Sequence, residues 1–175
     1  MIITDRSRLM KTETILNYTL NCLLLLLPIM LWNVFFTDKL PGGFSSAVFW
    51  KDIPAFVAGG ENFFRLVIFI IPVLMPLRFV TGTQKLGLSL YLVGTCIYFL
   101  SWVALMIAPQ SAWSLSPIGF LAPAYTPLIW LSGIGLIGSS LYFSSPYRSW
   151  MYVAISTAFI GFHFSHALIV YLRTP

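Results

Sequence analysis

Long uninterrupted runs of apolar residues dominate this sequence, and short polar segments separate them. Five of the runs have about the length, roughly 20 residues, that a helix needs to cross the hydrocarbon core of a bilayer. They cover residues 15–36, 62–80, 86–108, 118–143 and 150–172. The runs are continuous and do not alternate between apolar and polar positions, which disfavours a β-barrel. The pattern therefore predicts an all-α integral membrane protein, a five-transmembrane-helix bundle.

The segment between the first two runs is too apolar for a solvated linker. It reads FSSAVFWKDIPAFVAGG over residues 44–60. The preferred interpretation is a short interfacial helix after the first span, with Trp50 at the level of the lipid headgroups. The alternative is an ordered loop that caps the bundle.

Basic residues at the ends of the runs predict the orientation. The first run follows Arg6, Arg8 and Lys11, and cytoplasmic segments are enriched in such residues. With the N-terminus inside, six Lys and Arg residues lie inside and four lie outside: Arg6, Arg8, Lys11, Arg78, Lys85 and Arg148 against Lys39, Lys51, Arg65 and Arg173. We therefore expect the N-terminus inside and the C-terminus outside.

The composition indicates the same environment. Of 175 residues, 58% are hydrophobic and 9% charged, and the mean hydropathy is +0.87. In a soluble domain, about a quarter of the residues are charged. We therefore predict a single transmembrane domain over residues 1–175, multi-pass in a cell or inner membrane, with the lipid bilayer around it. The net charge of +5 comes from scattered basic residues, so no nucleic-acid partner is expected.

Prolines and glycines interrupt several runs. A G-x-G-x-x-G match at Gly133, Gly135 and Gly138 lacks the strand that a dinucleotide site requires, so it favours close helix packing through small residues. Each proline removes a backbone donor and predicts a kink, or alternatively a broken helix at a transport site. These prolines are Pro28, Pro72, Pro76, Pro117, Pro123 and Pro127.

Polar residues inside the runs fall on single faces of the predicted helices. Polar side chains in lipid cost free energy, so these faces should meet and hydrogen-bond between helices. The candidate interhelical stripe contains Asn17 and Asn21 in the first run, Tyr91, Thr95 and Tyr98 in the third, and Tyr152 and Ser156 in the fifth.

Four ionisable residues form a candidate polar cluster. His163 and His166, the only histidines in the sequence, are three residues apart and would point the same way from a helix. The predicted topology places Glu61 at the same outer end, where it would reach them if the second and fifth helices are neighbours. Arg65 follows Glu61 in the order that favours a helical ion pair, so a structural cap and ion pair is the alternative.

Metal and haem binding are weaker interpretations of the same residues. His163, His166 and Glu61 would supply three ligands to a metal ion such as zinc. A haem would need a second axial ligand from another helix. We predict no cofactor, and metal or haem binding remains an alternative to histidines that only link helices. The catalytic residues are unknown, because neither G-x-S-x-G nor HExxH occurs.

Three function classes follow from this pattern. The favoured one is non-enzymatic: an accessory subunit, scaffold or channel component of a membrane complex, with other membrane subunits or further copies of the chain as partners. The alternative is a small membrane enzyme or a metal- or haem-binding redox protein, working near the outer leaflet around His163, His166 and Glu61. A small-solute transporter is the third class.

Overall fold

The computed structural model describes residues 19–173, and its regular structure is helical throughout that range. The three longest helices are α4 (Ala55–Val73), α5 (Gly82–Ile107) and α10 (Ser149–Arg173). With the stretch Cys22–Lys39 they make four segments, among the described residues, that are long and apolar enough to cross a membrane.

The first of these segments is composite. It consists of the 3-10 helix η1 (Cys22–Leu25), α2 (Leu27–Phe36) and the 3-10 turn η2 (Thr37–Lys39). Pro28 lies in the first turn of α2, where its missing N–H needs no partner. Pro28 therefore begins a helix instead of kinking one. Residues 15–18 of the predicted first helix, including Asn17, lie outside the described residues.

The apolar segment 44–60 does not form one interfacial helix. It contains the end of η3 (Gly42–Phe44), the single turn α3 (Ser46–Phe49), a short connection through Pro54, and the start of α4. α3 packs against α10, which matches the alternative of an ordered cap. α4 begins at Ala55 instead of residue 62, and it ends at Val73 instead of residue 80. Pro72 lies in its last turn and favours this early end.

A capping box starts α5 four residues before the predicted 86. The Thr81 hydroxyl accepts the backbone N–H of Gln84 (3.2 Å), and Gln84 Oε1 accepts the backbone N–H of Thr81 (3.1 Å). This reciprocal pair satisfies donors that a helix start leaves free. α10 agrees within one residue at each end with the predicted 150–172.

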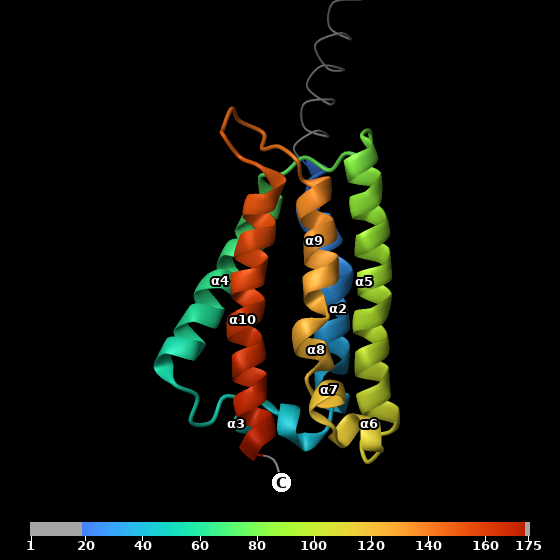
Figure 1. The fold of residues 1–175 in the computed structure, drawn as a ribbon, viewed down its shortest axis with the longest axis vertical. Coiled ribbons are helices and arrows are strands. Elements are labelled where there is room, and N and C mark those ends of the chain that lie inside the picture. Colours follow the sequence, from blue (N-terminus) through green and yellow to red (C-terminus); the bar gives the residue numbers. More distant parts are fainter. Residues whose placement is uncertain (1–18, 174–175) are drawn as a thin grey trace, which may run out of the picture.

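Shorter helices replace the continuous helix predicted over residues 118–143, and the last of them ends at Ile137. They are α7 (Pro117–Phe120), α8 (Ala122–Tyr125) and α9 (Pro127–Ile137), and α6 (Ala112–Leu115) precedes them. A proline stands in the first turn of α7, α8 and α9, because proline lacks the N–H that a continuing helix would need. From α7 to α9 the chain runs from one end of the bundle to the other (Figure 1).

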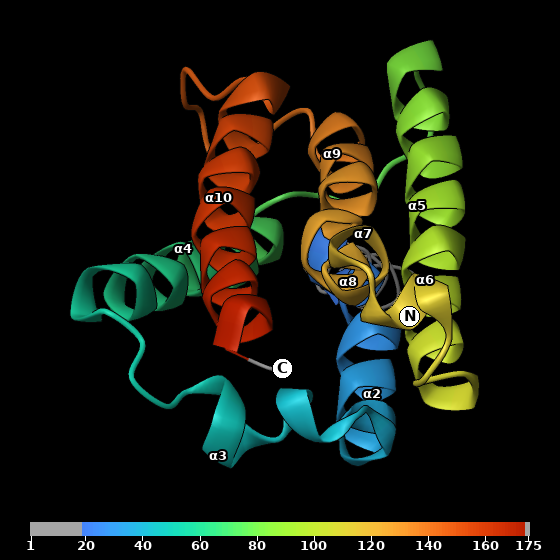
Figure 2. The ribbon, with the colours of Figure 1, turned by 60° about the horizontal axis from the view of Figure 1, so that its bottom comes forward.

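Two close helix pairs build the bundle. α5 packs along α9, and α10 packs along α4 and also contacts α9. Glycine permits the first pair: a Cβ added to Gly133 would lie 2.5 Å from the backbone nitrogen of Tyr91. The close packing predicted from the glycine pattern is therefore present at Gly133. α4 is inclined to the other long helices, so its Ala55 end stands away from α2 (Figure 2).

Tyr152 links α10 to α4 at the position where Pro72 leaves α4 without one backbone hydrogen bond. Its side chain is fully buried, and its hydroxyl donates to the carbonyl oxygen of Ile68 at 3.1 Å. That carbonyl is four residues before Pro72, which has no N–H to offer it. The tyrosine therefore supplies the donor that the proline removed, as a buried carbonyl requires.

We expect Tyr152→Phe to lower the free energy of unfolding by about 1 kcal/mol, the usual size for a hydrogen bond between membrane helices. Tyr171→Phe is the matched control, because its hydroxyl donates to the carbonyl of Leu115 at an exposed position, where water replaces it. Chemical denaturation in detergent micelles measures both. Equal stability of the two variants would mean that the Ile68 carbonyl finds another donor.

Candidate functional site

Glu61 is the centre of the site. Its side chain is fully buried, and its carboxylate has three partners. Oε1 accepts from the Arg65 guanidinium, one turn further along α4, and lies 3.0 Å from His163 Nδ1. Oε2 lies 2.5 Å from His166 Nδ1. The packing of α4 along α10 therefore places one carboxylate against two imidazoles and one guanidinium.

The hydrogen bonds locate the protons of His166. Its Nε2 lies 2.8 Å from the carbonyl oxygen of Phe49, and a carbonyl can only accept. Nε2 therefore carries a hydrogen. The short contact on the other side needs one further proton between Nδ1 and Glu61 Oε2. That proton makes the pair either imidazolium with carboxylate, or neutral imidazole with carboxylic acid.

A net positive charge remains on the cluster in either arrangement. The shared proton cancels the carboxylate charge within the Glu61–His166 pair, and Arg65 stays charged at any ordinary pH. The side chain of Arg65 is 35% exposed and also donates to Asn62 Oδ1 at 3.2 Å. Both other ion pairs of the described residues also involve Glu61. No second carboxylate therefore balances Arg65.

Aromatic rings enclose the histidines. The Phe49 ring lies 4.2 Å from the His166 ring, and the Trp50 ring meets His166 edge-on at 4.7 Å. Phe159 stacks on His163 at 5.4 Å, and the Arg65 guanidinium lies over Trp50 at 5.8 Å. The ring distances join ring centroids, and the Arg65 distance joins its guanidinium carbon to the centroid of Trp50. The connection between α2 and α4 therefore covers the cluster and excludes water from His166.

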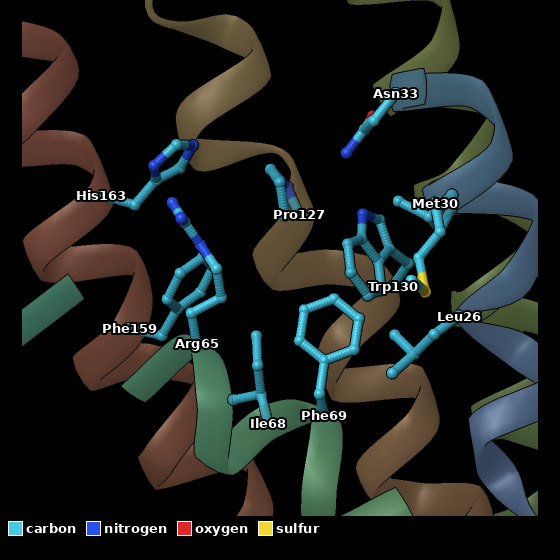
Figure 3. A pocket seen from close by; sticks show the side chains of 11 residues that line it. Leu26, Met30, Asn33, Arg65, Ile68, Phe69, Pro127, Trp130, Phe159 and His163 are labelled. Carbon is cyan, nitrogen blue, oxygen red and sulfur yellow. The ribbon is translucent and has the colours of Figure 1, made fainter. Parts of the chain in front are cut away.

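Two cavities adjoin the cluster, with volumes of about 310 and 360 Å³. Asn33, Arg65 and His163 line both. The smaller cavity lies among α2, α4, α9 and α10, and Figure 3 shows Arg65 reaching toward His163 at its edge. The rest of its wall is apolar except for the indole nitrogen of Trp130, and includes Leu26, Ile29, Met30, Ile68, Phe69 and Phe159.

All four residues of the candidate polar cluster, Glu61, Arg65, His163 and His166, meet in the structure. Their exposure differs: Glu61 and His166 are fully buried, whereas the His163 side chain is 22% exposed and lines both cavities. Arg65 and His163 are therefore the members that a small molecule in the cavities would contact.

Three tyrosines of the candidate interhelical stripe donate to groups outside the stripe. Tyr91 donates to the carbonyl of Leu25 (2.8 Å), Tyr98 donates to Asn33 Oδ1 (2.7 Å), and Tyr152 donates to the carbonyl of Ile68. Asn21 caps η1 through the N–H of Leu23, and Thr95 and Ser156 are buried. Two of the three tyrosines therefore satisfy backbone carbonyls that lie three or four residues before a proline, Pro28 or Pro72.

The geometry of His163, His166 and Glu61 is that of a hydrogen-bonded cluster. Within residues 19–173, no group of three or more His, Cys, Asp or Glu side chains has an arrangement that could hold a metal ion. Hydrogen bonds occupy both ring nitrogens of His166 in this arrangement. Metal or haem binding by His163, His166 and Glu61 therefore stays a prediction.

Sequence reasoning missed three parts of the site. The Phe49 carbonyl has no sequence signature, because every residue has one. Asn33 lines both cavities, and Trp130 lines one, with its indole nitrogen unpartnered among the described residues. The depth of Trp130 within its apolar run, far from the usual interface position of tryptophan, was the available signal.

The chain was compared with known proteins at the level of families, sequences and structures. No protein-family model matches it, and neither does any curated protein or any solved structure. The class that the fold itself defines is an all-helical protein with four helical segments, among the described residues, that could span a membrane. Functional inference therefore depends on the site alone.

Proposed function

We propose that this chain is a multi-pass integral membrane protein that binds a small molecule inside its helical bundle. This keeps it in the non-enzymatic group, as a transporter, a channel component or a binding subunit of a membrane complex. The supporting observation is that Arg65 and His163 line two adjoining cavities while Glu61 and His166 hold a proton behind them. Small-molecule sites are typically concave, apolar and furnished with few polar groups, and ionisable residues within membrane helices mark solute or proton pathways.

We further propose five passes, with the segment from α7 to α9 as the fourth. The ends of the bundle agree with this topology: α3, α6 and the last turn of α10 lie at one end, and the connections after α4 and α9 lie at the other (Figure 1). The second end would be the inner one, because Arg78, Lys85 and Arg148 lie in or next to the connections there, and Arg6, Arg8 and Lys11 precede the first span in the sequence.

Thiol labelling in intact cells tests the passes and their orientation. Gln110→Cys, after α5, should react with a membrane-impermeant maleimide, whereas Ser144→Cys, after α9, should react only once the membrane is permeabilised. The unmodified chain is the control, because Cys22 is fully buried and Cys96 lies on an apolar helix. Reversed reactivity would overturn the orientation, and equal reactivity at both sites would overturn the membrane topology.

Recovery of a bound compound tests the binding function. We expect protein purified in mild detergent to carry a small molecule that untargeted mass spectrometry detects. Met30→Trp should deplete it at least tenfold, because Met30 lines the smaller cavity and a larger ring would fill it. Val34→Trp is the control, one turn further along α2 and 74% exposed. Equal compound content in both variants would contradict binding at this cavity.

A further inference from the structure

Three of the polar side chains that line the smaller cavity, those of Trp130, Asn33 and Arg65, offer donors to it. Trp130 is 5% exposed, and its indole Nε1 has no hydrogen-bond partner in the described chain. An indole N–H can only donate. A buried donor without an acceptor is unfavourable, and this donor lies in the wall of a cavity. Trp130 therefore needs an acceptor that residues 19–173 do not supply.

Asn33 presents a second donor to the same space. The Tyr98 hydroxyl donates to its Oδ1 at 2.7 Å, which turns the amide nitrogen the other way. Figure 3 shows this nitrogen and the indole nitrogen of Trp130 both directed into the cavity. Two donors cannot bond to each other. An acceptor placed between them would satisfy both.

Charge restricts the acceptor further. Arg65 lines the same cavity and carries the charge that the Glu61–His166 pair leaves unbalanced. An oxyanion satisfies a guanidinium and neutral N–H donors together, and such charge-assisted hydrogen bonds are the strongest available. A neutral acceptor would leave the net positive charge of the Glu61, His166 and Arg65 cluster unbalanced.

The remaining wall requires an apolar body. Aliphatic and aromatic side chains from α2 and α4 cover it, among them Leu26, Ile29, Ile68 and Phe69. A volume of about 310 Å³ is at the lower end of the range of small-molecule sites. The cavity accommodates a headgroup and the nearest part of a chain, and the remainder of a long molecule would extend beyond it.

We propose that the ligand is an anionic amphiphile whose oxyanion headgroup binds Arg65, Asn33 and Trp130 while its hydrocarbon body lies along α2 and α4. This inference rests on the proposed binding function and names the chemistry of its ligand. A free fatty acid, with a carboxylate, and a phospholipid, with a phosphate, both have this chemistry.

Ligand titration followed by native mass spectrometry tests the headgroup. Purified protein is titrated with oleate, with phosphatidic acid in mixed micelles, and with oleyl alcohol, which has the hydrocarbon chain of oleate without its charge. We expect one molecule of oleate or phosphatidic acid per chain, bound at least tenfold more tightly than oleyl alcohol. The anion that binds more tightly identifies the ligand class: a fatty acid if it is oleate, and a phospholipid if it is phosphatidic acid.

Trp130→Phe tests the proposed donor without emptying the site. It removes the unpartnered N–H and keeps a ring, so the fold should persist, and we expect about tenfold weaker binding of the preferred anion. Trp32→Phe is the matched control, because the Trp32 indole nitrogen also has no partner among residues 19–173 but lines neither cavity. Equal weakening in both variants, or none in Trp130→Phe, would overturn the proposal.

The outcomes separate this inference from the proposed function. Oleyl alcohol binding as tightly as oleate, and displaced in Met30→Trp, would leave a small-molecule site standing and eliminate the oxyanion. If none of the three compounds binds and the purified protein carries no small molecule, the anionic ligand and the proposed binding function are both eliminated.

Discussion

Glu61→Ala is expected to lower the free energy of unfolding by about 3 kcal/mol, the largest effect of any single substitution that we predict. It leaves His163, His166 and Arg65 without their shared acceptor. Removing one partner of a buried ion pair costs about 3–5 kcal/mol. We take the lower end because Arg65 is 35% exposed and can turn toward water. Denaturation in detergent micelles measures the loss.

Glu61→Gln separates hydrogen bonding from charge at the same position. The glutamine oxygen can accept from Arg65 and His163, and its amide can donate to His166 Nδ1, because His166 Nε2 already carries the hydrogen that the Phe49 carbonyl accepts. We therefore expect a smaller loss, about 1 kcal/mol. Asp38→Ala is the control, since Asp38 is exposed and takes part in none of the three ion pairs of residues 19–173. Equal losses for Ala and Gln would mean that the charge of Glu61, and not its hydrogen bonding, stabilises the fold.

Gly133→Ala should lower the free energy of unfolding by about 2 kcal/mol. A Cβ there would lie 2.5 Å from the backbone nitrogen of Tyr91 and 2.6 Å from the carbonyl oxygen of Gly87. Backbone atoms cannot move aside as side-chain ends do, so α9 and α5 must separate. Overpacking of this kind costs about 1–3 kcal/mol, and the better helix propensity of alanine offsets up to about 1 kcal/mol.

Gly161→Ala is the matched control for Gly133→Ala. It also lies within a long helix, but a Cβ there would meet nothing within 4 Å. Stability should be unchanged or slightly raised, because alanine loses less backbone entropy than glycine. Thermal unfolding of both variants in one detergent checks the contrast. A Gly133→Ala protein as stable as Gly161→Ala would show that α5 and α9 tolerate a wider spacing.

Apolar content predicted the long helices well and the broken ones poorly. α5 and α10 differ from the predicted helices by a few residues, because a membrane helix is defined by hydrophobic length. α4 begins at Ala55, before the predicted 62, because Pro54 permits a helix start. Whether a proline kinks a helix or begins the next one depends on which neighbours supply its missing partners, and this information is not local.

The four residues of the candidate polar cluster could be found because ionisable groups are rare in apolar runs. Each additional part of the site depends on tertiary structure. The Phe49 carbonyl matters only because α3 packs against α10. Asn33 becomes a donor to the cavity only because Tyr98 takes its oxygen. Partners of this kind cannot be read from a single sequence.

The segmented path from α7 to α9 constrains which parts of this protein can touch lipid. Ala122, Pro123, Ala124 and Pro127 are buried, so the breaks in the backbone are surrounded by α5 and α10. Hydrocarbon offers no hydrogen bonds to an interrupted backbone. In the proposed membrane, α5 and α10 would therefore separate these breaks from the lipid. Insertion of the α7 to α9 segment into the membrane by itself would therefore be unfavourable. The segment should insert stably only after α5 and α10 are present.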